Sequence, residues 1–353
     1  MIRAFTPGVL ATAGFPTISY DVLDLGQAFR SDERLLRPQD IEAYAYAIDD
    51  YDPWFFEPGP FGGPIAHPTI LANQALFLRH NHYMVPAGLH ARMVYEFLAP
   101  IPLGTRARTL GTMVDKYWRR DKPYMVTGYE TVDEEGTPLV RGRFVQMLFA
   151  NDTVPAPGTS PRPDPEVSPV DPSITSAPGR SDRLTAGQQL PSLTREVTQR
   201  KIDIYSGVKP GSIHTDPEWA HAKGFDATIA QGMMSTAYVS TLMTTAVGTG
   251  FVAGGTIDCR FLRPVLCGDV LTVTGTVVGF APQEAEGERL RIHVAVTATN
   301  QRGEQTLDGS ATALTPQVTD RPHDRSRERR GRPMEECEPH ATPPRPERGR
   351  PRR

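Results

Sequence analysis

The chain has 353 residues, with 38 Lys and Arg against 41 Asp and Glu and a formal net charge of −3 at neutral pH. This length accommodates two domains, while a charge near zero gives no general attraction to nucleic acid or to an anionic membrane. No apolar run approaches the ~20 residues of a membrane-spanning helix, and the first residues make a poor secretory signal. The three cysteines, Cys259, Cys267 and Cys337, have neither metal-ligand nor disulfide spacing. We therefore expect a cytoplasmic protein without nucleic-acid or membrane partners.

Residues 30–150 are predicted to form a first domain. A helix is expected from Arg37 to Ile48, followed after a Gly- and Pro-containing loop by a mostly apolar helix from Pro68 to about His80. Proline suits the first position of a helix, where no N–H is needed, and a helix that is apolar on most sides belongs inside a structure. Four strands are then predicted, at Arg92–Leu98, Arg106–Tyr117, Tyr124–Val132 and Leu139–Phe149.

Residues 151–189 and residues 316–353 have the composition of chain that does not pack. The first segment is rich in proline, which neither donates to a strand ladder nor continues a helix, and it offers few apolar side chains to bury. The second segment is rich in Arg, Pro and Glu. We predict a linker between two domains and a disordered tail, whose interleaved acidic residues argue against binding to nucleic acid.

Residues 190–315 are predicted to form a second domain with the same order of elements. A helix is expected from Thr198 to about Tyr205, and then an apolar helix from Met233 to about Val247, with Gly248 placed to end it. Four strands follow, at Thr256–Leu262, Val270–Phe280, Leu290–Thr299 and Thr306–Leu314.

The two domains have the pattern of two copies of one unit. The run Phe97–Thr105 matches the run Phe261–Asp269 at an offset of 164 residues, and the turn Asp133–Gly136 matches Asn300–Gly303 at an offset of 167. Each copy is predicted to be an antiparallel sheet around one buried helix. The fold class is therefore α+β, and we expect the two sheets to join edge to edge as a pseudo-dimer.

The second domain contains a run of residues suited to proton transfer beside a polar ligand. It reads Ser206-Gly207, then Ile213-His214-Thr215-Asp216-Pro217, and then Ile229-Ala230-Gln231-Gly232-Met233. This run resembles the signature of the MaoC-like family of (R)-specific enoyl-thioester hydratases and dehydratases, and the stretch from Ile213 to Met233 fits it without a gap. The resemblance covers both domains and implies a double hotdog, in which each antiparallel sheet wraps around a buried helix.

The resemblance also implies a lyase reaction. Such an enzyme adds water to, or removes it from, the α,β-double bond of an acyl-CoA or acyl-carrier-protein thioester, as in fatty-acid, polyketide or secondary metabolism. The reaction needs a proton acceptor and a proton donor in one small volume, and amides at a helix N-terminus can stabilise the negative charge on the thioester oxygen. We expect no metal and no cofactor, because there is no P-loop, dinucleotide-binding glycine pattern or zinc spacing. A homodimer of double hotdogs is a further expectation.

Six residues are candidates for the site. As catalytic residues, the resemblance implies that His214 transfers protons, that Gly232 brings the thioester close to a helix terminus, and that Lys209 replaces the family's Asp. Substrate contacts are expected from Ser206, Gln231 and Met233. The structural alternatives are a relic histidine that packs its loop, a tight helix–sheet contact at the glycine, and an ordinary surface lysine.

The sequence departs from the family pattern at the catalytic carboxylate. Counting from the two ends of the motif places Val208 or Lys209 at the Asp position, and in the first domain Phe55 stands where the family has His. The first domain is therefore predicted to be non-catalytic. Its Asp50 either caps a loop in a retired site or reaches His214 across the pseudo-dimer. A protein that only binds a thioester or scaffolds a partner, and a hotdog thioesterase, are the alternative functions.

Overall fold

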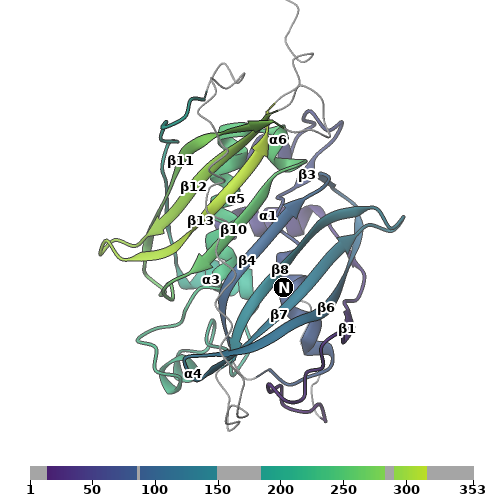
Figure 1. Cartoon of the computed structure of the whole chain (residues 1–353), viewed down its shortest axis with the longest axis vertical. Coiled ribbons are helices and arrows are strands. Elements are labelled where there is room, and N and C mark those ends of the chain that lie inside the picture. Colours follow the sequence, from purple (N-terminus) through teal and green to yellow (C-terminus); the bar gives the residue numbers. More distant parts are fainter. Residues whose placement is uncertain (1–13, 86–87, 149–183, 283–289, 316–353) are drawn as a thin grey trace, which may run out of the picture. The chain divides into compact units, whose positions relative to one another are not determined.

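The computed structural model describes residues 14–85, 88–148, 184–282 and 290–315 (Figure 1). These residues belong to a unit that spans Met1–Gln317. The predicted tail, with Cys337, and most of the predicted linker lie outside the described residues.

One antiparallel sheet contains strands from both halves of the chain. Its order is β1-β6-β7-β8-β4-β10-β13-β12-β11-β9, with β2 paired to β6. The first half contributes β1 (Ala28–Arg30), β2 (Arg34–Leu35), β4 (Gly88–Phe97), β6 (Arg106–Arg119), β7 (Lys122–Val132) and β8 (Pro138–Leu148). The second half contributes β9 (Leu193–Glu196), β10 (Thr256–Phe261), β11 (Val270–Pro282), β12 (Leu290–Thr299) and β13 (Gln305–Leu314). The short strands β3 (Ile65–Ala66) and β5 (Ile101–Pro102) pair separately. The antiparallel pairing of β4 with β10 confirms the predicted edge-to-edge junction.

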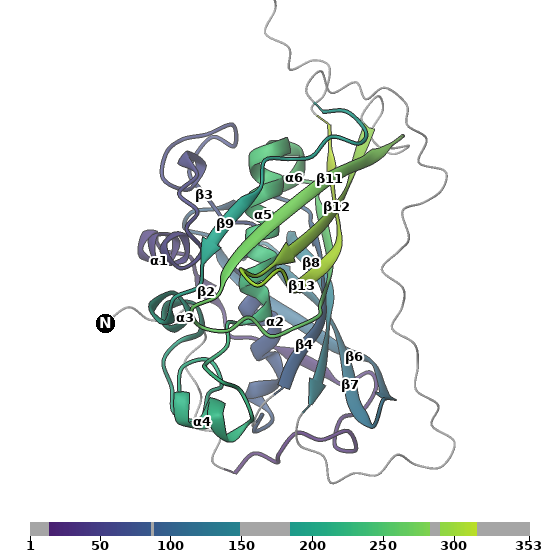
Figure 2. The same ribbon diagram turned by 90° about the vertical axis from the view of Figure 1, so that its left-hand side faces the viewer.

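The helices lie on one side of this sheet (Figure 2). The two central ones that pack on it are α2 (Ala72–Phe77), continued by the 3-10 turn η2 (Leu78–Asn81), and α5 (Gly232–Val247). All residues of α2 and residues 233–244 of α5 are buried, which confirms the two central helices predicted from their apolar sequences. Outside them, α1 (Pro38–Ile48) packs against α3 (Gln199–Ser206). The remaining short helices are η1 (Pro53–Phe55), α4 (Pro217–Ala222) and α6 (Thr249–Val252).

The first central helix begins later than predicted. Residues 68–71 form tight turns, because the amides of Ile70 and Ala72 bond to carbonyls three residues earlier. The regular helix therefore starts at Ala72 rather than at Pro68. Within the described part of the chain, no helix has both the length and the apolar character needed to cross a membrane.

The domain boundaries also lie further toward the N-terminus than predicted. Ala28 pairs with Thr112 of β6, so the first domain begins before residue 30. Leu184 is buried and Gln189 forms a bridge with Thr276 of β11. The last residues of the predicted linker are thus part of the second domain's sheet edge.

A pair of glycines shows the duplication in three dimensions. Gly142 of β8 lies against the carbonyl of Val94 in β4, and Gly309 of β13 lies against the carbonyl of Asp258 in β10, so closely that a Cβ at either glycine would collide with backbone. The two glycines are 167 residues apart and the two carbonyls 164 residues apart, which are the offsets of the sequence repeat. The two strands that join the domains, β4 and β10, are therefore each approached closely by a glycine from the neighbouring strand of their own domain.

Replacing either glycine by alanine should destabilise the protein. We expect Gly142→Ala and Gly309→Ala each to lower the free energy of unfolding by about 1–3 kcal/mol, because the added methyl group collides with the backbone of the neighbouring strand of the same domain. Gly63→Ala is the matched control, since a Cβ there has no neighbour within 4 Å. Chemical denaturation measures all three, and junction variants as stable as the Gly63 variant would contradict the close contact.

Candidate active site

A cavity of about 1130 Å³, counted to its open mouth, lies between residues of both domains. The second domain contributes the end of α3, the loop before α4, the start of α5 and the residues after β10, while the first contributes residues of α2, η2, β4 and β8. Five of the six predicted site residues line it: Ser206, Lys209, His214, Gln231 and Gly232. Residues that are up to 26 positions apart in the sequence are therefore brought to one place.

The loop that carries His214 is held by short-range hydrogen bonds. Asp216 is the N-cap of α4: its Oδ1 accepts from the Trp219 amide at 3.1 Å, and its Oδ2 accepts from the Gly211 amide at 2.8 Å. The His214 amide donates to Ser212 Oγ at 3.2 Å. Asp216 and Pro217 thus start a helix directly after the histidine and help to fix where its ring lies.

The His214 ring has a defined tautomer. Its Nδ1 lies 2.7 Å from the carbonyl oxygen of Ile229. A carbonyl can only accept, so Nδ1 carries the proton and Nε2 presents a lone pair. Burial lowers the pKa of His214 to about 4, against the bond to Ile229, which raises it, and Lys209 lowers it further. The ring is therefore neutral at physiological pH, and none of the described residues bonds to Nε2.

The start of α5 faces the same cavity. Gly232 and Met233 are the first two residues of the helix, so their amides have no carbonyl within the helix to bond. A Cβ at Gly232 would lie 3.1 Å from ring carbons of Phe261. The glycine is thus both a cavity residue and the tight helix–sheet contact that was its structural alternative. An oxygen in the cavity can approach these amides at the positive end of the helix dipole.

The Met233 side chain does not line the cavity, so the contact with substrate expected of this residue stays a prediction for its backbone amide. The side chain is fully buried. One residue advances an α-helix by about 100°, which turns Met233 from the cavity toward the core beside Gly232. Only its backbone amide remains available to a ligand.

Lys209 is a cavity residue and not an ordinary surface lysine. Its side chain is half-buried, its Nζ lies 5.3 Å from the centre of the Phe77 ring, and burial lowers its pKa. Val208, the other residue at the family's Asp position, is 72% exposed and points away from the lining. Of the two residues that can stand at the family's Asp position, the one that lines the cavity is therefore a cation.

Ser206 and Gln231 are buried polar residues of the lining. Ser206 ends α3 and is 2% exposed. Gln231 precedes α5, and within the described structure its Oε1 has no hydrogen-bond partner. A buried amide oxygen without a partner is costly, which is the expected state of a group whose partner is a ligand.

The sequence analysis missed the wall that the first domain contributes. His80 of η2, His90 of β4 and Gln146 of β8 line the cavity. His90 and Gln146 are opposite each other in the β4–β8 register, next to a β-bulge between His90 and Arg92. Bulges re-aim side chains beside functional sites. The second domain's site is thus completed by the first domain.

The sequence repeat contained a signal for this wall. Thr241 of α5 faces the first domain's own Asp50 at 2.7 Å. Subtracting the repeat offset of 164 from 241 gives position 77, and Phe77 lines the second domain's cavity. Each central helix therefore contributes to the other domain's site, a relation that the offset could have revealed.

The first domain's counterpart of the site is closed. Asp50 accepts from Thr241 Oγ1 at 2.7 Å, and its Oδ2 lies 3.5 Å from His67 Nε2. Burial alone would raise the pKa of Asp50, but His67 and Thr241 lower it below its ordinary value. Phe55 packs over the His67 ring at 5.5 Å between centres. Asp50 thus crosses to the second domain but meets Thr241, so the alternative in which it reaches His214 is wrong.

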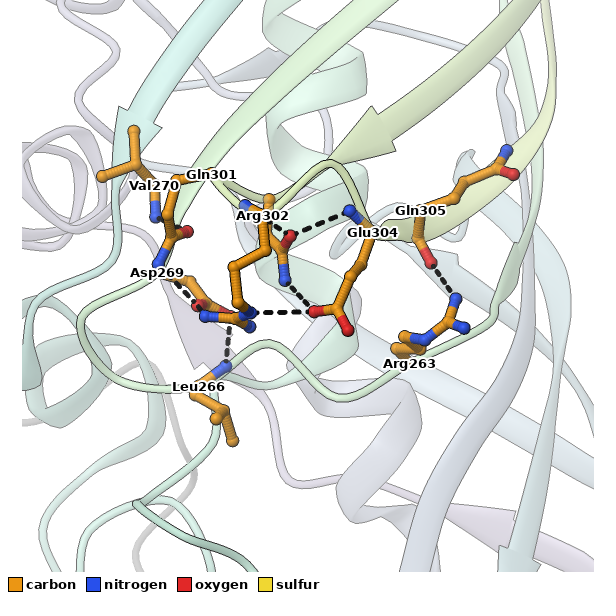
Figure 3. A network of polar contacts seen from close by, with 9 residues as sticks. Arg263, Leu266, Asp269, Val270, Gln301, Arg302, Glu304 and Gln305 are labelled. Atoms are coloured by element: carbon orange, nitrogen blue, oxygen red, sulfur yellow. Dashed lines mark hydrogen bonds and ion pairs between the residues drawn. The ribbon is translucent and has the colours of Figure 1, made fainter.

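A polar network connects the segment after β10 with the β12–β13 turn (Figure 3). Asp269 is buried and accepts from the Leu266 amide, from Gln301 Nε2 and from Arg302 Nη1 at 2.9–3.1 Å. Arg263, which lines the cavity, donates to the Gln305 carbonyl at 3.2 Å. These bonds tie the segment after β10 to the β12–β13 turn and fix one side of the opening.

The second half of the chain is similar in sequence to known proteins. Residues 183–301 match the family model of the MaoC like domain. The chain is 26% identical over 134 residues to the (R)-specific enoyl-CoA hydratase of Rhodospirillum rubrum, an alignment that covers 36% of this chain and 86% of that protein.

Solved structures show the same fold over both domains. A putative MaoC domain protein dehydratase from Chloroflexus aurantiacus superposes with a TM-score of 0.66 at 14% identity, covering 85% of this chain and 98% of its own. A Mycobacterium tuberculosis protein described as having a double hotdog fold superposes with a TM-score of 0.57 at 18% identity, covering 86% and 99%. The predicted double hotdog is confirmed.

The neutral tautomer of His214 can be measured by NMR. In protein labelled with ¹⁵N-histidine, we expect the His214 resonances of a protonated Nδ1 and an unprotonated Nε2, assigned by their loss in His214→Asn. Because burial lowers the pKa to about 4, the ring should stay neutral as the pH falls from 7 to 5 and gain its proton only near pH 4. A midpoint near the ordinary value of 6.5 would contradict the described environment.

Proposed function

We propose that the protein adds water to, or removes it from, the α,β-double bond of an acyl thioester, since residues 183–301 match the MaoC like domain and the fold is a double hotdog. One observation carries the proposal: a neutral histidine with a free Nε2 lone pair and an uncapped helix N-terminus face the same cavity. CoA is the carrier in the name of the Rhodospirillum rubrum hydratase, and we propose CoA here. Four expectations from the sequence stay predictions: a carrier-protein thioester as substrate, a role in polyketide or secondary metabolism, a homodimer, and a cytoplasmic location.

The proposed hydration uses His214 as the base. Nε2 takes a proton from water while the water oxygen bonds to the β-carbon of the enoyl group. The electron pair of the double bond moves onto the thioester oxygen, where the amides of Gly232 and Met233 stabilise the negative charge. The imidazolium then returns its proton to the α-carbon, and the thioester carbonyl reforms. Dehydration is the same sequence in reverse.

The family's carboxylate has no direct replacement in this scheme. A charged ammonium has three donors and no acceptor, so Lys209 cannot take a proton from water in its charged form. We assign it an electrostatic role toward a negatively charged group of the substrate. Ser206 and Gln231 are the buried polar residues that can hold the water or the thioester.

Loss of the base should nearly abolish turnover. We expect His214→Asn to slow the loss of enoyl absorbance, measured with a panel of enoyl-CoA thioesters, by about 10²–10⁴-fold. Asparagine retains a donor for the Ile229 carbonyl, so the loop should keep its conformation.

His221→Asn is the matched control for this experiment. His221 is an exposed histidine of α4 whose Nδ1 also bonds a backbone carbonyl, that of Phe225 at 2.9 Å. This variant should retain wild-type turnover. If the wild type binds these thioesters without consuming them, or if His214→Asn turns over as fast as the wild type, the protein is a binding module and not a hydratase.

A further inference from the structure

The charges around the cavity are all of one sign. Among the described residues that line it, Lys209 and Arg263 are cationic, and none is an aspartate or glutamate. Arg263 lies at the exposed rim, where it donates to a backbone carbonyl. Lys209 lies inside, with its ammonium over the Phe77 ring. A half-buried ammonium in a cavity without a carboxylate has no partner of opposite charge there, and an anionic ligand could supply one.

Lys209 is held at this place by its backbone. Its amide donates to Thr215 Oγ1 at 3.1 Å, and the same hydroxyl donates back to its carbonyl at 3.1 Å. Thr215 follows His214 directly, so the lysine and the catalytic base belong to one braced loop. Across the described structure, no carboxylate comes within ion-pair distance of the ammonium.

A second cation lies behind the first domain's wall. Arg79 is 1% exposed, and its guanidinium donates to Gln146 Oε1, approaches Met125 Sδ at 3.7 Å and lies 5.0 Å from the centre of the Phe144 ring. None of these partners is negatively charged. A buried arginine is normally paired with an acid, so this one leaves a positive potential next to the cavity.

Arg79 orients the side-chain amide of Gln146. An arginine has only donors, so the oxygen of the Gln146 amide faces Arg79. The amide nitrogen is then the end that can donate to a group in the cavity. His90 is opposite Gln146 across the strands, and its Nε2 has no partner within the described structure. The first domain therefore presents three polar side chains, His80, His90 and Gln146, beside apolar ones in the lining of the cavity.

The neighbouring histidines respond to the same potential. Burial lowers the pKa of His80 to about 3, and Lys209 and Arg79 lower it further. Burial also lowers the pKa of His90 to about 3, with Arg79 as the next cause. Cations thus act on both rings, while no acid opposes them.

We propose that the acyl group of the substrate carries a carboxylate, which binds the Lys209 ammonium against the polar wall of His80, His90 and Gln146. The substrate class is then the monothioester of an unsaturated or β-hydroxylated dicarboxylic acid. This inference rests on the proposed hydratase function, because it uses the same cavity. It also gives the lysine at the family's Asp position a function that an alkyl-chain substrate does not require.

Binding of saturated thioesters tests the inference without any turnover. Succinyl-CoA is compared with butyryl-CoA, and adipoyl-CoA with hexanoyl-CoA, by isothermal titration calorimetry on the full chain. Both members of a pair carry the same CoA, so contacts at the rim, including those of Arg263, cancel in the ratio. We expect the carboxylated member of at least one pair to bind about tenfold more tightly or better, the size of a hydrogen bond to a charged group.

Lys209→Met removes the charge while keeping much of the side chain's length. It should bring the ratio of affinities to within about threefold of unity while leaving the affinity for the alkyl thioester nearly constant. Lys223→Met is the matched control, since that ammonium also lies over an aromatic ring, Trp219 at 4.8 Å, but outside the cavity lining. It should keep the wild-type ratio.

The outcomes separate this inference from the proposed function. Equal affinities within both pairs for the wild type overturn the carboxylate inference, even if enoyl thioesters are hydrated. An equal loss of affinity for both members in Lys209→Met also overturns it, because the lysine then contacts the shared CoA or thioester. A wild-type preference that Lys209→Met abolishes supports the inference, even if no hydration is found and the proposed function fails.

Discussion

The antiparallel pairing of β4 with β10 is the contact on which the rest of the molecule depends. It joins the sheets of the two domains, with Val94 opposite Asp258 at its centre. Arg92 of β4 forms an ion pair with Asp258 of β10 across the junction, in which Nε lies 2.7 Å from Oδ1 and Nη2 lies 2.5 Å from Oδ2. The arginine side chain is 3% exposed. A bidentate buried pair of this kind fixes register as well as proximity, since a shift of one residue would separate its partners and turn every side chain to the other face.

The composite cavity follows from this register. The bulge next to Arg92 directs His90 toward the second domain, and the central helix α2 ends close to the loop that carries His214. By the same symmetry, α5 brings Thr241 to Asp50 in the first domain. One site has kept an open cavity with a neutral base, whereas in the other Phe55 and a buried Asp50–His67 pair fill the space. The duplication thus produced one open site whose walls come from both copies.

Most of the fold could be predicted from the sequence, because the relevant signals are local. The alternation of apolar and polar residues marked the eight long strands. The apolar sequence of α5 marked a buried helix, whose observed bounds differ by one residue from the prediction. The short edge strands β1 and β9 were missed, because strands of three and four residues have too few positions to show a period. The tight turns at residues 68–71 were missed because a Pro at the start of an apolar run is equally suited to a helix.

The site was predictable only where it follows the family motif. His214, Gly232 and Lys209 lie together as expected, since the motif is nearly continuous in the sequence. His90 and Gln146 were not found, because strand pairing and a bulge bring them there and neither is visible in a single strand's sequence. The burial of the Met233 side chain could not be predicted, because the motif does not show which side of the helix faces the core. The site therefore combines a local motif with a wall that forms only where the two sheets join.

The most direct measurement is a crystal structure of the protein with a bound 3-hydroxyacyl-CoA or a non-reactive thioether analogue of an enoyl-CoA. The account predicts the acyl oxygen, or its equivalent, within about 3.2 Å of the Gly232 or Met233 amide. The β-carbon should face Nε2 of His214, and the acyl chain should run along the wall formed by His80, His90 and Gln146. A ligand seated at the Asp50–His67 pair, or one whose β-carbon lies away from His214, would contradict it.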